Sequence, residues 1–155
     1  MIQAFTIRVY GILSSENKNI LVSDEIIQGK FYTKFPGGGL EFEEGTHECL
    51  IREFKEETGL DISIRQHIYT TDFFQQSAFN EKEQVISIYY LVESKEISQL
   101  KIAKNIFEFS EDQLSGKNQQ ENFRWISLNE INENSVTLPI DKIVVGMIKR
   151  MIFDL

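Results

Sequence analysis

Cysteine is nearly absent from this sequence. Its 155 residues include one cysteine, Cys49, and a single cysteine excludes an internal disulfide, so no covalent cross-link supports the fold. Cys49 stands next to Leu50 within a predicted helix, and this position favours packing over thiol chemistry. The sequence is therefore compatible with a reducing compartment.

Long apolar runs are also missing. No stretch approaches the roughly 20 apolar residues that are needed to cross a bilayer. The N-terminal segment MIQAFTIRVYG lacks the charged start and the apolar core of a signal peptide. We therefore expect a cytoplasmic protein that has no membrane partner.

Basic residues are in the minority. The sequence has 16 Lys and Arg against 24 Asp and Glu, which gives a net charge of −8. Binding to duplex nucleic acid relies on Lys and Arg that neutralise phosphates, so this balance argues against it. A free nucleotide is still allowed, because a bound metal ion inverts the potential that a phosphate meets.

The length and composition are typical of one globular domain. A chain of 155 residues with 41% hydrophobic residues can bury a core of normal size. We find no internal repeat and no composition shift that marks a boundary. The prediction is a single domain over residues 1–155.

Apolar periodicity predicts six extended segments, at residues 5–14, 20–26, 31–35, 62–74, 85–92 and 123–127. The first two should form a hairpin, because the turn-rich sequence SSENKN separates them. Residues 93–120 are rich in Lys, Glu, Ser, Gln and Asn. We expect loops there, with one strand near residues 100–103, and we treat this stretch as a candidate specificity insert.

Three helices are predicted, at residues 46–58, at residues 128–133 and from Pro139 to the C-terminus, where proline suits the first turn. The last helix carries an apolar stripe that should face the core, made of Ile140, Ile143, Val144, Met147, Ile148, Met151 and Ile152. Apolar strands between this helix and the helix at residues 46–58 predict an α/β fold, with a mixed β-sheet covered on both faces.

The ends of the helix at residues 46–58 are well marked. The Thr46 hydroxyl can cap its N-terminus, and Glu48 lies in the first turn, where the helix dipole favours an anion. Gly59 can adopt the left-handed conformation that ends a helix. Start and stop signals therefore agree.

One face of this helix is acidic. Glu53, Glu56 and Glu57 project within an arc of roughly 100°, and like charges at such spacing repel by about a few tenths of a kcal/mol per pair. Arg52 lies beside Glu53 and four residues before Glu56, so its guanidinium can hold one or both carboxylates. A bound cation would relieve the remaining repulsion, and hard oxygen ligands favour Mg²⁺ or Mn²⁺.

A glycine-rich loop precedes the acidic helix. Pro36 is followed by three glycines at residues 37–39, so the backbone can approach a ligand closely. By itself, the acidic cluster would be an ordinary solvated helix face. The glycines upstream favour a metal site instead, because their carbonyls can reach the same cation.

The segment at residues 38–60, GGLEFEEGTHECLIREFKEETGL, resembles the Nudix box. Nine positions fit that pattern, namely Gly38, Glu44, Arg52, Glu53, Phe54, Glu56, Glu57, Gly59 and Leu60. The box is the signature of the Nudix hydrolases, which cleave nucleoside diphosphates linked to another moiety. The resemblance implies the α/β/α sandwich of that family over essentially the whole chain.

The resemblance also implies roles for individual residues. Glu53, Glu56 and Glu57 would be metal ligands, together with the Gly38 carbonyl, and Arg52 would orient the carboxylates. Glu44 would be structural or would act outside the first layer of metal ligands. Many family members have a glycine before Glu44, whereas this chain has Glu43 there and Gly45 one place after it, so the loop conformation is an open question.

Metal-assisted attack of water at phosphorus requires a base. Glu53 is a candidate within the box. Outside it, Glu121 is the best candidate for a base or an additional ligand, followed by Glu81 and Glu83, which precede the segment at residues 85–92. Each of these three residues can also be an ordinary surface glutamate.

The substrate is not specified by the box. Phe73, Phe74 and Phe79 lie in a polar stretch, where a ring could stack on a base or sugar, although core packing or a dimer contact explains them equally well. The chain lacks the SQPWPFPxS-like array of the NADH type and the tyrosine typical of diadenosine polyphosphate hydrolases, and the stretch that follows the box contains no proline, since only Pro36 and Pro139 exist. These absences weaken the NADH, ADP-ribose and dinucleoside polyphosphate assignments.

Two interpretations remain. The first is a pyrophosphohydrolase acting on a nucleoside diphosphate derivative or a nucleoside triphosphate. The second is a binding or regulatory Nudix domain that senses a nucleotide-sugar or ADP-ribose without cleaving it. Such domains usually have degraded boxes, whereas Arg52, Glu53, Glu56 and Glu57 are all present here, so the first is preferred. A homodimer is the expectation that the family carries.

Overall fold

The computed structural model describes residues 1–153, with side chains up to Met151. The chain forms two compact units. The first unit comprises Met1–Leu13 and Pro36–Gln99, and the second comprises Ser14–Phe35 and Leu100–Leu155. Each unit is therefore built from two segments that are distant in the sequence.

The first unit contains a four-stranded mixed sheet in the order β4-β1-β6-β5. Its strands are β1 (Ala4–Leu13), β4 (Gly37–Gly39), β5 (Ser63–Thr70) and β6 (Glu83–Glu93). The two long strands, β1 and β6, run parallel, and the edge strands β4 and β5 are antiparallel to their neighbours. A parallel pair needs a crossover, and the segment between β1 and β6 includes the helix α1 (Thr46–Thr58).

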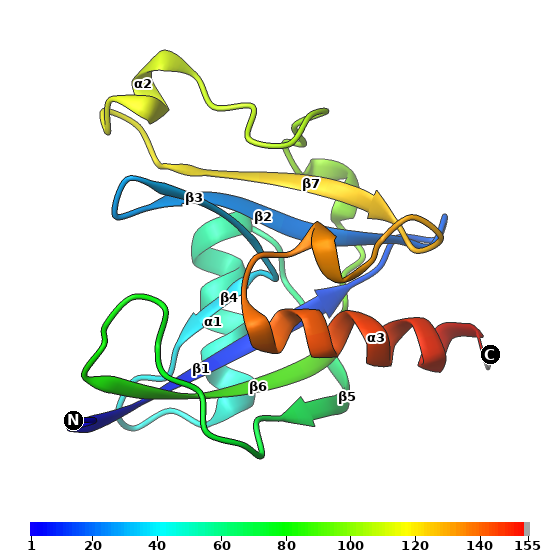
Figure 1. Ribbon diagram of the computed structural model, residues 1–155. Coiled ribbons are helices and arrows are strands. Elements are labelled where there is room, and N and C mark those ends of the chain that lie inside the picture. Colours follow the sequence, from blue (N-terminus) through cyan, green and yellow to red (C-terminus); the bar gives the residue numbers. More distant parts are fainter. Residues whose placement is uncertain (154–155) are drawn as a thin grey trace. The chain divides into compact units, whose positions relative to one another are not determined.

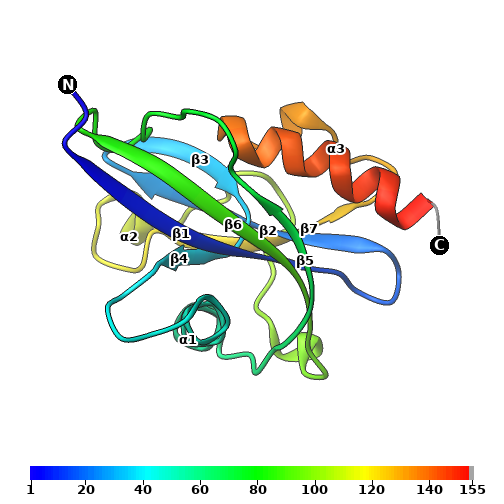
Figure 2. The ribbon, with the colours of Figure 1, turned by 90° about the horizontal axis from the view of Figure 1, so that it is seen from below.

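Helix α1 packs against β1 and β4, and Figure 2 shows it along its axis, below these strands. The contact depends on a missing side chain, since a Cβ at Gly11 of β1 would overlap the ring of Phe54. Phe54 is fully buried, as are Cys49 and Leu50 on the same helix. The apolar side of α1 thus faces the sheet, as its sequence pattern predicts.

The second unit contains a three-stranded antiparallel sheet in the order β3-β2-β7 (Figure 1). Its strands are β2 (Asn19–Ile27), β3 (Lys30–Lys34) and β7 (Glu121–Ser127). The unit also contains the short helix α2 (Glu111–Leu114), the 3₁₀ turn η2 (Glu133–Ser135) and the long helix α3 (Pro139–Phe153). The 3₁₀ turn η1 (Ile97–Gln99) belongs to the first unit.

The predicted hairpin between residues 5–14 and 20–26 is wrong. These strands exist, but they belong to different sheets, and around their junction the sheet ladder is reduced to an isolated bridge between Ser14 and Ile20. β2 forms its hairpin with β3 instead, through Gln28 and Gly29, whose φ angles are 51° and 75°. Two successive left-handed residues give the turn whose twist suits a two-residue hairpin.

Two further local predictions fail. The helix expected at residues 128–133 is replaced by η2, because the Asn132 side chain accepts a hydrogen bond from the Asn134 N–H and Ser135 Oγ accepts one from the Asn132 N–H. Such side-chain bonds compete with helix formation. The strand expected at residues 100–103 is reduced to an isolated bridge between Ile102 and Phe123.

Helix α3 begins at Pro139 as predicted, but its buried face is rotated from the predicted stripe. Ile140, Val144 and Ile148 are buried, whereas Ile143 is 39% exposed. Val145 and Asp141 are buried in its place. Met147 and Met151 are half-buried, and the side chain of Ile152 lies outside the described residues.

The predicted α/β class is confirmed, with helices and a mixed sheet. The prediction of one sheet did not separate the strands into a mixed and an antiparallel sheet, because periodicity shows that a strand is half-buried but not which strand it pairs with. Among the described helices, none has the length and apolar character that crossing a membrane requires.

Candidate functional site

Helix α1 has the predicted bounds, but its N-terminal cap differs from the prediction. Gly45 is the extended N-cap residue, and its N–H donates to the Glu48 carboxylate. Thr46, the first helical residue, shares a hydrogen bond of 2.7 Å between its hydroxyl and that of Tyr90. The prediction that Thr46 caps the helix is therefore wrong, whereas Gly59 ends the helix with a φ of 76°, as predicted.

The glycine loop is pressed against this helix. β4 pairs with β1 so that Gly38 lies opposite Val9. A Cβ at Gly38 would overlap the carboxyl group of Glu53, and one at Gly37 would overlap the Val9 carbonyl. Only glycine therefore lets the Glu53 carboxylate lie against the loop backbone, which brings Gly38 and Glu53 together as expected.

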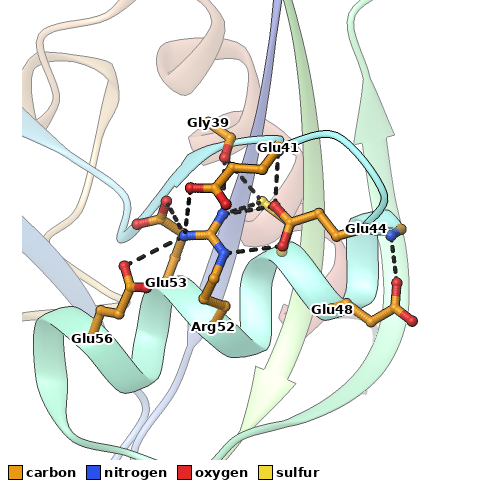
Figure 3. A network of polar contacts seen from close by, with 9 residues as sticks. Gly39, Glu41, Glu44, Glu48, Arg52, Glu53 and Glu56 are labelled. Atoms are coloured by element: carbon orange, nitrogen blue, oxygen red, sulfur yellow. Dashed lines mark hydrogen bonds and ion pairs between the residues drawn. The ribbon is translucent and has the colours of Figure 1, made fainter.

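Arg52 is the centre of the polar network in Figure 3. Its Nε and Nη2 atoms donate to the two carboxylate oxygens of Glu44, at 3.0 and 2.7 Å. This is the bidentate geometry that makes arginine–carboxylate pairs strong and directional. Arg52 thus ties the middle of α1 to the loop that precedes it.

The same guanidinium contacts three more acidic residues and a carbonyl. Nη1 donates to Glu53 at 3.0 Å and to Glu56 at 3.4 Å, and lies 3.7 Å from a Glu41 oxygen. Nη2 also donates to the Gly39 carbonyl at 3.2 Å. Four carboxylates around one guanidinium leave an excess of negative charge, which a bound divalent cation would reduce.

The pKa values show how strongly this pairing holds. The hydrogen bond from Arg52, followed by the one from the Glu41 N–H, lowers the pKa of Glu44 to about 2. The same Glu44 contact raises the pKa of Arg52 above its usual value. Glu44 is therefore ionised at any physiological pH, and it balances Arg52 without taking part in proton transfer.

Cys49 lies under this network. Its side chain is fully buried, and its Sγ donates to the Gly39 carbonyl at 3.4 Å. Burial, with the nearby charge of Glu44, raises the pKa of the thiol to about 12. The thiol is therefore neutral and unreactive, and the prediction of packing is confirmed.

The loop before Glu44 keeps its path at the expense of backbone strain. Glu43 has a φ of 69°, in the left-handed region that glycine adopts freely and other residues rarely do. This is the position where Nudix sequences often have glycine. Gly45, one place after Glu44, has an ordinary φ of −83°, so it does not take over the role of that glycine.

Glu56 and Glu57 complete the acidic face of α1. The Glu56 side chain is 59% exposed, whereas that of Glu53 is 14% exposed. Glu57, one turn after Glu53, is half-buried. The acidic face therefore includes both exposed and partly buried carboxylates.

Glu121 lies in the second unit, at the start of β7. Its Oε1 is 3.0 Å from Ser23 Oγ, which is 3.1 Å from Glu25 Oε1, and Glu25 also pairs with Lys34 Nζ at 2.9 Å. Lys34 is buried. We refer to these residues, Ser23, Glu25, Lys34 and Glu121, as the β-sheet acid cluster.

One hydroxyl proton cannot serve both carboxylates of this cluster. Burial, and then the charge of Glu25, raises the pKa of Glu121 to about 7. A protonated Glu121 can donate to Ser23 Oγ while Ser23 donates to Glu25, so both contacts are satisfied. Burial and the neighbouring Glu25 thus favour the neutral form of Glu121.

Sequence reasoning missed the partners of Glu121. Ser23, Asp24 and Glu25 interrupt an otherwise apolar strand, and Lys34 ends the next one. A polar run within a buried strand was the available signal. The sequence did not show the pairing of β2 with β7, which places Glu25 opposite Glu121.

The other candidates lie elsewhere in the first unit. Glu83 opens β6 opposite Ala4, whereas Gly38 lies opposite Val9, and five strand residues span about 17 Å. Glu83 is therefore far from the box, and Glu81 is exposed in the preceding loop. Phe73 and Phe74 are exposed, and Phe79 is half-buried.

Known proteins resemble this chain in sequence pattern and in fold. A model of the NUDIX domain matches residues 4–145. A NUDIX hydrolase from Nitrosomonas europaea is 15% identical with a TM-score of 0.69, over 94% of this chain and 89% of that chain. The MutT protein from Methanosarcina mazei Go1 is 19% identical with a TM-score of 0.66, over 97% of each chain.

An ADP-ribose pyrophosphatase from Streptococcus suis 89-1591 is 16% identical with a TM-score of 0.60, over 94% of this chain and 90% of that chain. No curated protein matches this chain. At these identities, the structural matches establish the fold and leave the substrate open.

Proposed function

The chain belongs to the NUDIX family of pyrophosphohydrolases, and from this premise we propose that it cleaves a nucleotide-type diphosphate bond with the help of a divalent metal ion. The proposed substrates are nucleoside diphosphates linked to another moiety, or nucleoside triphosphates. The observation that carries this proposal is the Arg52 network, in which four carboxylates surround one guanidinium beside a glycine loop.

The metal would be held by Glu53, Glu56, Glu57 and the Gly38 carbonyl. These donors are all oxygen atoms, which suit Mg²⁺ or Mn²⁺ better than softer metals. The overlap that any Cβ at Gly38 would make with the Glu53 carboxyl supports this choice, because it keeps carbonyl and carboxylate close together. Arg52 would orient the carboxylates through the bonds it already makes.

A bound divalent ion would supply charge neutralisation at the diphosphate and orientation of the attacking water. The chain's own residues then have separate tasks. Arg52, which Glu44 holds through a bidentate contact, would fix the carboxylates of Glu53 and Glu56, and Gly38 leaves room for the Glu53 carboxyl group. Glu121 is our candidate base outside the box, because a pKa of about 7 suits proton transfer near neutral pH.

The alternative is a domain that binds a nucleotide-sugar or ADP-ribose without cleaving it. The complete set of Arg52, Glu53, Glu56 and Glu57, with Arg52 in contact with both Glu53 and Glu56, favours hydrolysis, because a pure sensor has no need for an organised cluster of acidic ligands. We also propose that residues 1–155 act as one functional domain in the cytoplasm.

The test is a panel of nucleoside triphosphates, ADP-ribose, nucleotide sugars and dinucleoside polyphosphates, incubated with Mg²⁺, with Mn²⁺ or with a chelator. Hydrolysis of one class, abolished by the chelator, would support the hydrolase; the products to detect are pyrophosphate or phosphate from a triphosphate and nucleotide or sugar phosphate esters from the other classes. Thermal stabilisation by one ligand without any cleavage would support the sensor and overturn the hydrolase.

A further inference from the structure

The side chain of Arg8 lies against the glycine loop, on the face of the first sheet opposite to α1. Arg8 belongs to β1 and is paired with Gly39 of β4. Its Nη1 atom is 3.8 Å from the position that a Cβ would occupy at Gly39. Gly11 on the same strand faces Phe54 of α1, and successive residues of a strand point to opposite faces. Arg8, three residues before Gly11, therefore faces away from α1.

The guanidinium of Arg8 is held by a buried tyrosine. Its Nε donates a hydrogen bond of 2.9 Å to the Tyr10 hydroxyl, and its Cζ lies 5.7 Å from the centre of the Tyr10 ring. Tyr10 is buried and packs on Tyr89, with ring centroids 5.2 Å apart. Arg8 itself is half-buried. A charged group that is already oriented loses little conformational entropy when it binds a ligand.

Three charged side chains surround the glycine strand β4. On the α1 side, the Glu53 carboxyl group fills the position of a Cβ at Gly38. Arg52 donates to the Gly39 carbonyl at 3.2 Å, and Arg8 lies against the opposite face of Gly39. β4 is an edge strand of its sheet, so a ligand that is bound at its free edge can reach both faces.

Helix α1 closes one of these two faces to a substrate. Leu50 and Phe54 are fully buried on its apolar side, and the Glu53 carboxyl group leaves no space even for a Cβ at Gly38. The face that carries Arg8 differs, because Gly39 has no side chain to cover the guanidinium. A substrate whose diphosphate is held at the glycine loop would therefore extend over the Arg8 face.

A guanidinium at this place suits a phosphate group. Arginine stays charged at any physiological pH, and its planar fork can donate two parallel hydrogen bonds to phosphate oxygens. The chain has a net charge of −8, and the acidic face of α1 repels every phosphate that the metal ion does not neutralise. A cation on the other side of β4 would offset this repulsion.

We propose that Arg8 binds a phosphate group of the substrate, across the glycine loop from the carboxylates of α1. This inference rests on the proposed function. It adds to the site a phosphate-binding residue on β1, which lies outside the box.

The test uses Arg8→Gln, with Arg65→Gln as the matched control. Both changes replace an arginine of the first unit by a neutral side chain, but Arg65 is exposed on β5 and pairs with Glu93. KM and kcat are measured for the best substrate of the panel. Calorimetry in Mg²⁺ gives Kd for imidodiphosphate, a diphosphate analogue with no base or sugar, and melting temperatures check that each variant is folded.

We expect Arg8→Gln to raise both KM and the Kd of imidodiphosphate by about tenfold to about 150-fold, which corresponds to the loss of one hydrogen bond to a charged group. The change in kcat should be smaller, because the contact is made in the bound substrate and in the transition state alike. Arg65→Gln should match the parent protein.

Two results would overturn the phosphate site and leave the hydrolase standing. The first is an unchanged KM and Kd in a folded Arg8→Gln variant whose turnover is intact. The second is a raised KM with an unchanged Kd for imidodiphosphate, because Arg8 would then contact a part of the substrate other than its phosphates.

Binding to the parent protein separates the two proposals and does not depend on the folding of a variant. The Nε–H signals of Arg8 and Arg65 are followed by NMR while imidodiphosphate is added in Mg²⁺. A shift of the Arg8 signal alone would support the phosphate site even if no substrate of the panel is cleaved and the hydrolase proposal fails. If the Arg8 signal does not move, the phosphate site is wrong.

Discussion

Glu44 and Glu121 are both glutamates within polar clusters, yet their pKa values move in opposite directions. In the first unit, two hydrogen bonds from Arg52 lower the pKa of Glu44 to about 2. In the second unit, burial and the neighbouring Glu25 raise the pKa of Glu121 to about 7. The arginine fork stabilises the charged form, whereas desolvation and a like charge stabilise the neutral form.

The two kinds of carboxylate are therefore suited to different tasks in hydrolysis. The Arg52 network is suited to hold charge, because the bidentate contact with Arg52 stabilises the ionised form of Glu44. The β-sheet acid cluster is suited to hold a proton, because burial and the charge of Glu25 raise the pKa of Glu121. Substitutions at each kind of carboxylate test this division.

Removing a charge from the acidic face of α1 should have the largest effect. Glu56→Gln or Glu57→Gln should lower turnover by orders of magnitude, because an amide is a poor replacement for a carboxylate ligand of Mg²⁺. Steady-state kinetics with a titration of Mg²⁺ measures this loss. Circular dichroism and the melting temperature should match those of the parent protein, and unchanged activity would contradict the metal site.

Glu121→Gln should lower kcat by about 10²- to 10⁴-fold, the range for loss of a general base. Binding of Mn²⁺, followed by its electron paramagnetic resonance signal, should be retained if Glu121 moves a proton and does not ligate the metal. The control is Glu111→Gln, which changes an exposed glutamate of the same unit and should leave kcat unchanged.

Arg52→Lys should lower kcat/KM by about 10- to 100-fold, the usual effect of losing a residue that orients metal ligands. An ammonium group cannot reproduce the bidentate contact with Glu44 or reach Glu53 and Glu56 together. The pKa of Glu44, followed by NMR titration, should rise towards its ordinary value. Parent-like kinetics would contradict the orienting role of the guanidinium.

Stability should depend on pH through Glu121. Its pKa is raised in the folded protein from 4.5 to about 7, so the folded state binds more protons than the unfolded state between these values. The stabilisation is therefore complete below pH 4.5 and is lost as the pH rises towards about 7. Urea unfolding at pH 5 and pH 8 should show this loss, and Glu121→Gln should make the difference smaller.

Glu43→Gly should stabilise the protein slightly. Glycine adopts the left-handed conformation without the steric cost of a Cβ, which adds about 1–2 kcal/mol to the free energy of unfolding. The greater backbone freedom of glycine in the unfolded state offsets about 0.5–1 kcal/mol of this gain. Urea unfolding measures the remaining gain. Glu43→Ala removes the same carboxylate but keeps a Cβ, so it should show no gain, and an equal gain in both variants would assign the effect to charge.

Much of the first unit's site could be read from residue order alone. Helix α1 runs from Thr46 to Thr58 as predicted, because its apolar and acidic faces follow a period of 3.6 and Gly59 ends it. Arg52 and Glu56 meet because residues at i and i+4 lie on one face of a helix whatever the remainder of the chain does. Local spacing determines local geometry.

The strand pairing of the second unit could not be predicted in the same way. The pairing of β2 with β3 and β7 brings Glu25, Lys34 and Glu121 together although 96 residues separate the two glutamates' strand positions, 25 and 121. The expected hairpin at residues 5–26 failed for the same reason. The periodicity of a strand shows which of its sides is buried. It does not show which other strand it pairs with, because that depends on all the strands that are available for pairing in the folded chain.

The sequence by itself determined the box helix, the glycine loop and the family, because these depend on residues within a short stretch whose geometry is set by helix periodicity and by missing side chains. Only the tertiary structure decided that Glu43 would take the left-handed conformation, that Glu25 would lie opposite Glu121 and that the pKa of Glu121 would be raised. Those outcomes depend on burial and on contacts between residues far apart in the chain, and burial changes the free energy of a charge or a ring in ways that residue order does not specify.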